Sequence, residues 1–573
     1  MVYNGWFMFL LSWYDVRERG IDISEYFDSN GFQNIAVYGV GEIGRRVISD
    51  FQNCGIHIAC CIDRMQLESY NGIPCILPKQ VPEERLDVIV VTPVDFYDEI
   101  EKSLMDSGAS CLVISVDEIY AELCGRKKFD FLFQRDLSGV LRSEEKEFLD
   151  TVEQSGITEE FLEANKYGML LNLQNKIPIE RYRRLVETIF HKNIERLKEK
   201  QTVKIAFVVY LDSAWSCDKL YWLLDGNEHF EPFILVVSAG RDKKRYDKAA
   251  DYYCSRGYRA LRYEEYRNEN FRDAYDGRWA DVMIRVNTYG EGGAPKVDLS
   301  NCSLATLHAV VPYTFWLDRE TDVLQEGMNC GCVWKFFCPS LLHKKAGIEK
   351  CMIGNINMSY TGYPKMDYFF EHSGSQEEGR KTIIYAPGGT VQGVATTFMI
   401  NSRKLLELSR TYSSCRWIYR AHPYLGEVLV RSKQIYSIDE YNAYVGEWKK
   451  LPNACVSETA DYYDIFMESS AMITDSISFV SGYQYTGKPL LVLKVPDAEY
   501  NEYGRMIMAA QYQCMGDDYG SIEKFIADVV VGGNDPGKER RDEFFEENLN
   551  YYKTNGMTAG EKIYEILSKN LSK

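Results

Sequence analysis

The chain has 573 residues, and at roughly 150 residues per domain this length predicts three or four compact units rather than one core. The composition is 45% hydrophobic and 26% charged with only 16 prolines, which excludes collagen-like and broadly disordered classes. The net charge is −18 and no long basic run occurs, so binding to nucleic acid is disfavoured.

The first 30 residues contain an apolar segment from Trp6 to Trp13. This segment is shorter than the roughly 20 residues of a spanning helix and lacks the basic start of a secretory signal. We expect it to pack on the first domain or, as the alternative, to lie on a membrane surface. The 16 cysteines show neither zinc-type nor redox spacing, which predicts buried, reduced thiols in a cytoplasmic protein.

Residues 31–125 have the order of a small Rossmann-like domain. An apolar strand is followed by Gly39, Gly41 and Gly44, then by a helical stretch and a second strand that ends at Asp63. In dinucleotide-binding units such glycines form the tight turn at a phosphate, and the acidic residue accepts a hydrogen bond from a ribose hydroxyl. The pattern therefore predicts either a nucleotide-binding site at these four residues or a scaffold that keeps the turn without a ligand.

Two further α/β halves are predicted after a helical linker. Charged, helix-period sequence over residues 126–200 predicts the linker, and strands alternate with helices over residues 201–375 and again over residues 376–573. Ligands of open α/β sheets bind at the carboxyl ends of strands, so the residues after each predicted strand are candidate site residues.

Four places carry such candidates. His308 emerges from an apolar run and is either a general base or a hydrogen-bonded structural histidine. The other three places follow predicted strands of the second half, and each is a candidate phosphate-binding group. The alternative for the first is an ordinary turn, for the second a surface arginine with a structural histidine, and for the third a helix cap. The three places are Gly388-Gly389-Thr390, Arg420 with His422, and Asp475 with Ser476 and Ser478.

The motifs around these residues resemble the CDP-glycerol glycerophosphotransferase family, which builds wall teichoic acid and related capsular polymers. The resemblance covers about residues 203–515 and rests on Thr361-Gly-Tyr-Pro-Lys365-Met-Asp367, Tyr385-Ala-Pro387, His422-Pro423, Thr474-Asp-Ser-Ile-Ser478 and Gly487-Lys-Pro489. It implies an α/β fold in which a GT-B-like pair of Rossmann-like domains follows the small N-terminal domain and the linker. The N-terminal domain resembles the one found beside sugar acyltransferases.

The resemblance also implies a reaction and a set of roles. A polyol-phosphate group, most simply glycerol phosphate, would pass from a CDP-activated donor bound in the second half to a polymer or lipid-linked acceptor, and CMP would leave. His308 would be the base, Arg420 would supply positive charge and Asp475 would orient the hydroxyl groups. The pyrophosphate would be held by His422, which with His308 is one of the two expected catalytic residues, and by Ser476, Ser478 and Gly389.

Two alternative functions fit the same residues. One is a GT-B glycosyltransferase or epimerase that uses a nucleotide-sugar. The other is a non-catalytic binding subunit of a capsule assembly complex, which is favoured by Leu307-His308-Ala309 in place of the family's Trp-His-Gly.

The expected ligands and location follow from the same reading. We expect no required cofactor besides the CDP-glycerol-type donor as substrate, a nucleotide as a further ligand of the N-terminal domain, and no metal, because the seven histidines are scattered. We expect a cytoplasmic protein. Contact with the inner face of the cell membrane would use the first apolar segment and the clusters Lys243-Lys244-Arg245 and Lys449-Lys450, which otherwise are plain solvated surface.

Overall fold

A computed structural model of the chain describes residues 5–65, 67–109, 111–123, 141–174, 176–210, 212, 215–237, 243–270, 273, 276–286, 297–317, 328–372, 380–391, 394–458, 462–494 and 500–573. The chain divides into two compact units, Met1–Leu137 and Ser138–Lys573.

The first unit is built on one sheet with the strand order β3-β4-β2-β1-β5-β6. All neighbouring pairs run parallel except β3 and β4. The strands are β1 (Ile35–Tyr38), β2 (Ile58–Ile62), β3 (Ser69–Tyr70), β4 (Ile73–Ile76), β5 (Val88–Val91) and β6 (Leu112–Ser115). The helices are α1 (Gly5–Glu18), α2 (Ser24–Asn30), α3 (Glu42–Asn53), α4 (Tyr97–Asp106) and α5 (Val116–Leu123).

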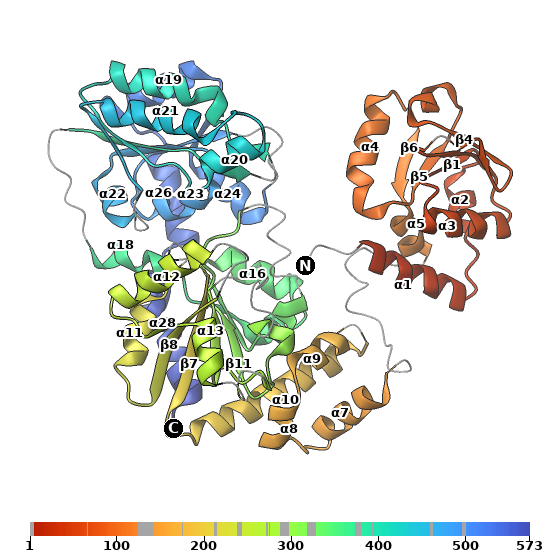
Figure 1. The fold of residues 1–573 in the computed structure, drawn as a ribbon, viewed down its shortest axis with the longest axis horizontal. Helices are drawn as coiled ribbons and strands as arrows, with labels where there is room; N and C mark the ends of the chain where they lie inside the picture. The colour runs from red at the N-terminus through yellow and green to blue at the C-terminus, as the bar shows by residue number, and fades with distance from the viewer. Residues whose placement is uncertain are drawn as a thin grey trace. The chain divides into compact units, whose positions relative to one another are not determined.

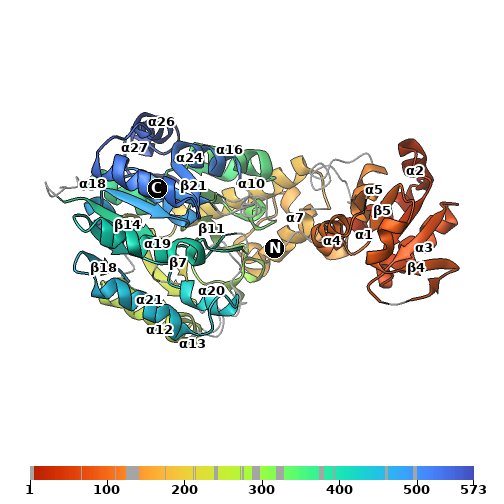
Figure 2. The ribbon, with the colours of Figure 1, turned by 90° about the horizontal axis from the view of Figure 1, so that it is seen from above.

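Helices cover both faces of this sheet because its central strands are apolar throughout. Val88 and Val90 point to one face, where α1, α2, α3 and α5 pack, and Ile89 and Val91 point to the other, where α4 packs. Figure 2 shows α3 and α4 on opposite sides of the strands. Phe9 of α1 is buried in the first of these clusters, as expected for a segment that packs on this domain.

The second unit begins with helices that lie against its first sheet. They are α7 (Ser143–Glu153), α8 (Glu159–Ala164), α9 (Tyr167–Leu173) and α10 (Ile179–Lys198). The Tyr167 hydroxyl donates to the carbonyl of Thr306 at 2.7 Å, and the Asn193 amide donates to the carbonyl of Leu304 at 2.6 Å. These bonds attach α9 and α10 to the segment that leads into strand β11.

The first half of this unit is an all-parallel sheet with the order β13-β12-β11-β10-β7-β8-β9. Its strands are β7 (Val203–Val209), β8 (Phe230–Val236), β9 (Ala260–Arg262), β10 (Val282–Arg285), β11 (Leu307–Val310), β12 (Lys335–Cys338) and β13 (Met358–Tyr360). Its helices are α11 (Asp218–Asp225), α12 (Lys243–Ser255), α13 (Tyr263–Glu269), α16 (Leu341–Lys350) and α17 (Gly354–Asn357).

The second half is a second all-parallel sheet with the order β18-β17-β14-β19-β20-β21. Numbered within the half, this order is 3-2-1-4-5-6, that of dinucleotide-binding folds. Its strands are β14 (Thr382–Ala386), β17 (Arg416–Tyr419), β18 (Ala454–Val456), β19 (Ala471–Thr474), β20 (Leu490–Lys494) and β21 (Tyr512–Met515), and a small hairpin is formed by β15 (Thr390–Val391) and β16 (Val394–Ala395).

Alternate residues of these strands feed two apolar clusters. Ile383 and Tyr385 pack beneath α19, α20 and α21, whereas Ile384 and Ala386 pack against α22, α23, α24 and α26. Figure 1 shows α19 and α21 above the sheet and α22, α23, α24 and α26 below it. The helices are α19 (Phe398–Thr411), α20 (Leu425–Arg431), α21 (Ile438–Lys450), α22 (Tyr463–Glu468), α23 (Ile477–Gln484), α24 (Glu502–Ala510), α25 (Tyr519–Lys524), α26 (Lys538–Asn548) and α27 (Tyr551–Asn555).

The chain crosses between the two halves twice. The first crossing follows β13 and contains α18 (Asp367–Glu371), and the second leads from α27 to α28 (Ala559–Leu571). Helix α28 packs on α10 and α11 (Figure 1), so the chain's last helix lies with the linker and the first half. The sequence had placed all of residues 376–573 in the second half, because an amphipathic helix does not reveal which body its apolar face will cover.

These three mostly parallel sheets, each flanked by helices, confirm the predicted fold class: a GT-B-like pair of Rossmann-like domains preceded by a small Rossmann-like domain and a helical segment. Within the described residues, no helix combines the length and the apolarity that crossing a membrane requires.

Candidate functional site

Three of the predicted loops meet at one edge of the second sheet. Strands β17, β14 and β19 are neighbours and run parallel, so the residues that follow them emerge side by side. These residues are Pro387 to Gly389, Arg420 to Pro423, and Asp475 to Ser478. Between β14 and β19 the order of the strands reverses, and this switch point is where open α/β sheets bind ligands.

A cavity of about 370 Å³ lies at this point. Its volume falls in the range of small-molecule sites. It is lined by Gly389, His422, Tyr424, Glu427, Val428, Arg431, Ser476, Ile477 and Ser478. The structure therefore brings together four residues expected to bind phosphate, whereas the side chain of Thr390 lies outside the described residues.

The turn after β14 has glycines because its neighbours leave no room for side chains. A methyl group on Gly389 would lie 2.8 Å from His422 Nδ1, and one on Gly388 would lie 3.1 Å from the Cα atom of Ser476. The backbone amide of His422 also donates to the carbonyl of Pro387 at 2.9 Å. The three loops are thus packed directly on one another.

Asp475 is buried and holds the glycine turn in place. Its carboxylate accepts hydrogen bonds from the backbone amide of Gly388 and from both the backbone amide and the hydroxyl of Thr397, at 2.5 to 2.8 Å. Burial raises the pKa of Asp475 above its ordinary value, although these bonds favour the charged form. Asp475 was expected to orient hydroxyl groups of the ligand. In the structure its carboxylate instead accepts hydrogen bonds from Gly388 and Thr397 of the protein.

His422 presents one ring nitrogen to the protein. Its Nδ1 accepts a hydrogen bond from the backbone amide of Tyr424 at 3.2 Å. A neutral imidazole that accepts at Nδ1 carries its hydrogen on Nε2, and burial favours the neutral form by lowering the pKa of His422. In a cavity lined by serines and a glycine turn, such a ring is a hydrogen-bond donor for an anionic ligand.

Arg420 does not line this cavity. It is buried, its guanidinium donates to the hydroxyl of Ser457 at 2.9 Å, and it lies 5.9 Å from the ring centres of both Tyr462 and Phe479. The expectation that Arg420 supplies charge beside the other phosphate-binding residues differs from this placement, because its side chain turns from the end of β17 toward α22 and α23.

His308 lies inside strand β11 rather than after it. The imidazole is fully buried, its Nδ1 accepts from Arg285 at 3.2 Å, and Tyr167 packs edge-on against it at 4.7 Å. Burial and the neighbouring guanidinium lower the pKa of His308 well below its ordinary value. An imidazole enclosed in this way does not reach an acceptor hydroxyl, so the geometry speaks against its expected role as general base.

In the first unit, Gly39 and Gly44 form the predicted turn. Gly39 has a φ of 93°, which favours glycine, and a methyl group on Gly44 would lie 1.8 Å from the Gly39 carbonyl oxygen, while Gly41 precedes α3 with open space around it. Asp63 accepts hydrogen bonds from the backbone amides of Val40 and Met65 at 2.7 and 2.8 Å. The carboxylate is therefore bonded to the turn itself, and the binding of a nucleotide here stays a prediction.

The residues expected at a membrane have protein partners. Lys450 pairs with Glu447 at 2.7 Å, and Lys449 pairs with Glu458 at 3.7 Å. The side chains of the cluster at 243–245 lie outside the described residues, and membrane contact stays a prediction. In the described part of the chain, no three metal-ligating side chains come together.

The sequence reading missed the helix that forms one wall of the cavity. Tyr424, Glu427, Val428 and Arg431 lie on or beside α20, directly after His422-Pro423. Their spacing of three and four residues places them on one helix face. The same spacing of three and four residues is visible in the sequence directly after His422.

Two family models match separate parts of the chain. Residues 31–114 match a model described as C2185-like, N-terminal. Residues 340–569 match the model of CDP-Glycerol:Poly(glycerophosphate) glycerophosphotransferase, which confirms the resemblance found in the sequence and the expected enzyme class, a CDP-glycerol glycerophosphotransferase-like transferase. A search of the curated proteins found no match.

Several solved structures are similar in fold. A putative UDP-N-acetylglucosamine 2-epimerase from Listeria monocytogenes is 14% identical over 65% of this chain and 97% of its own, with a TM-score of 0.43. The wall teichoic acid polymerase TagF is 12% identical over 69% of this chain and 95% of its own, with a TM-score of 0.42. The residues that line the cavity lie within the part of the chain that matches the glycerophosphotransferase model.

Proposed function

We propose that this protein transfers a polyol-phosphate group, most simply glycerol phosphate, from a CDP-activated donor to a hydroxyl group of a cell-surface polymer or a lipid-linked acceptor. The observation that carries the proposal is the cavity of Gly389, His422, Ser476 and Ser478 at the switch point of the second sheet, inside residues that match the glycerophosphotransferase model. The proposed location is the cytoplasm, with contact at the inner face of the membrane where the acceptor is lipid-linked.

In the proposed step, the acceptor oxygen attacks the β-phosphorus of the donor. A new P–O bond forms to the acceptor, the bond between this phosphorus and the bridging oxygen breaks, and CMP leaves with the electron pair of that bond. The hydroxyl proton passes to solvent. Phosphoryl transfer of this kind depends mainly on positioning and on stabilising charge at the phosphoryl oxygens, so the site needs donors more than it needs a strong base.

The described residues supply such donors. Ser476 precedes helix α23, whose first backbone amides and positive dipole end favour an anion. Ser478 and His422 line the same cavity, and an imidazole that accepts at Nδ1 can donate from Nε2. In a protein with a net charge of −18, these groups concentrate local positive potential where the diphosphate would bind.

The test is a screen of activated donors by their released nucleotide. With CDP-glycerol and a polyol-phosphate acceptor, the wild-type protein should release CMP. His422→Ala should lower the rate by at least about a hundredfold, the scale of a lost electrostatic or acid–base group. His191→Ala, in which an exposed histidine of α10 is removed, is the matched control and should leave the rate unchanged.

Release of a nucleoside diphosphate from a nucleotide-sugar, with no CMP from any CDP-polyol, would show a glycosyltransferase or epimerase instead. Failure of the wild-type protein to bind or turn over any activated donor would favour a non-catalytic subunit.

A further inference from the structure

Helix α20 forms a wall of the cavity that the proposed phosphate contacts leave unused. The helix begins three residues after His422, and the cavity-lining residues Glu427, Val428 and Arg431 lie along one of its faces. Between Leu425 and Arg431 the helix rises by about 9 Å. The wall therefore extends away from His422, and a donor whose diphosphate lies beside His422 would have its nucleoside along this wall.

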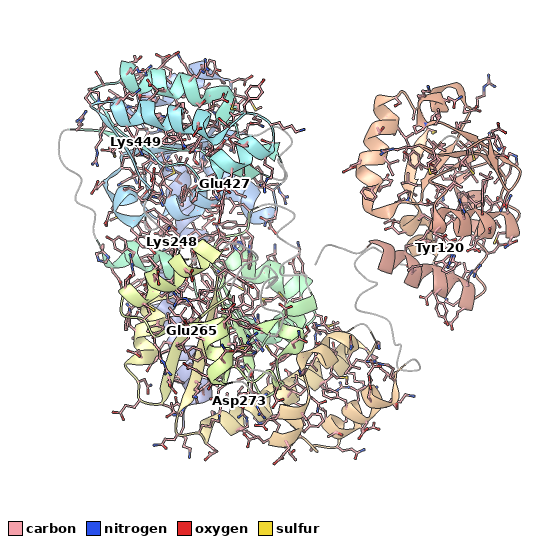
Figure 3. The ribbon with its side chains drawn as sticks, in the orientation of Figure 1. Tyr120, Lys248, Glu265, Asp273, Glu427 and Lys449 are labelled. Atoms are coloured by element: carbon pink, nitrogen blue, oxygen red, sulfur yellow. The ribbon has the colours of Figure 1, made fainter. Side chains whose placement is uncertain are left out.

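The side chains of this wall suit a nucleobase. Tyr424 and the buried Val428 offer an aromatic and an aliphatic surface, on which a flat ring can pack. Glu427, labelled in Figure 3, and Arg431 are exposed on the same face, four residues apart. A carboxylate only accepts hydrogen bonds and a guanidinium only donates them, so the wall presents one acceptor and one donor side by side.

We propose that Glu427 and Arg431 select cytidine over uridine nucleotides by hydrogen bonding to the edge of the base. The proposal rests on the proposed function, because it assumes that a nucleotide binds in this cavity. Glu427 would accept from the exocyclic amino group of cytosine, a contact that carboxylates make with this base. Arg431 would donate to the neighbouring ring nitrogen and carbonyl oxygen of the base.

Uracil has the opposite hydrogen-bonding group at the position that would face Glu427. It has a carbonyl oxygen where cytosine has the amino group, and this oxygen would face the Glu427 carboxylate without a hydrogen between them. A polar site rejects a ligand that leaves its groups unpaired more strongly than it rejects a small change in size. Selection by Glu427 is therefore a matter of donors and acceptors, not of cavity volume.

The experiment is a calorimetric titration of the full chain with CMP and with UMP. The wild-type protein should prefer CMP, and Glu427→Gln should lower the ratio of CMP to UMP affinity by about tenfold or more, the scale of a base-reading contact. The matched control is Glu407→Gln on the exposed side of α19, which should leave the ratio unchanged. Thermal unfolding of each variant verifies that it is folded.

The outcomes separate this inference from the function that it assumes. If Glu427→Gln binds CMP and UMP in the wild-type ratio, the inference is overturned while the cytidine-dependent function stands. If Arg431→Gln weakens both nucleotides equally, Arg431 contacts phosphate and its part of the proposal is wrong. If the wild-type protein binds no cytidine nucleotide, the proposed function itself fails.

Discussion

Gly389 lies where a methyl group would be 2.8 Å from a ring nitrogen of His422. Such a contact forces either the turn or the imidazole to move, and both supply groups that face the cavity. We therefore expect Gly389→Ala to weaken CMP binding by about tenfold or more, the scale of losing one hydrogen bond to a charged group. Titration calorimetry measures this loss.

The control for Gly389→Ala is another glycine-to-alanine substitution in the same half. Gly446 lies within α21 and has no atom within 4 Å of the position of its added methyl group. Gly446→Ala should leave binding unchanged and raise the free energy of unfolding by about 0.5–1 kcal/mol, because alanine loses less backbone entropy in a helix. Equal binding by both variants would show that the packing of Gly389 on His422 is not required.

The sequence predicted which residue types follow the strands but not where each side chain points. Gly389, His422, Ser476 and Ser478 come together because parallel strands end at one edge. Arg420 leaves the same edge, yet its side chain turns toward Tyr462. The orientation of a side chain depends on neighbours distant in sequence, which a motif does not contain.

At the scale of elements, Asp367 joins the two crossings between the halves. Its carboxylate accepts hydrogen bonds from the hydroxyl of Tyr551 at 2.6 Å and from the backbone amides of Ala559 and Gly560 at 2.8 Å. These amides begin helix α28, and a carboxylate suits the positive end of a helix dipole. Burial nevertheless raises the pKa of Asp367 to about 6.

This raised pKa predicts a pH dependence of stability. The folded protein holds the proton of Asp367 more tightly than the unfolded chain, so the group favours the folded state below about pH 4 and loses this contribution as the pH rises through about 6. Relative to Asp367→Asn, the free energy of unfolding of the wild-type protein should fall by about 1 kcal/mol between roughly pH 5.5 and 7.5. Urea unfolding at a series of pH values measures the difference.

Asp518→Asn is the matched control, because Asp518 is exposed, joins no crossing and has its pKa lowered by hydrogen bonds from Ser521. Its difference from wild type should not vary over the same interval. A difference for Asp367→Asn that is constant with pH would contradict the prediction.

Elements were predicted better than their assembly. The alternation of strands and helices over residues 376–573 predicted a parallel sheet, and the sheet that contains β14 is parallel throughout. The packing of α28 on the first half was missed, since only the folded chain determines which of two apolar surfaces the helix covers.

At the scale of the whole molecule, the chain has two compact units, and every residue that lines the cavity belongs to the second. A compact unit with its own core is expected to fold alone. Residues 138–573, produced without the first unit, should therefore fold cooperatively and bind CMP with the affinity of the full chain. Circular dichroism and titration calorimetry test this expectation, and a fragment that folds but has lost CMP binding would contradict it.

The double crossing has a mechanical consequence for the second unit. Two domains joined by a single segment of chain are free both to bend and to twist about that segment. Here a second connecting segment is present, and the hydrogen bonds of Asp367 with Tyr551 and Gly560 join it to the first. Two connections held together in this way resist twisting more than one connection does, so we expect any opening of the two halves to be a bend at this joint rather than a twist.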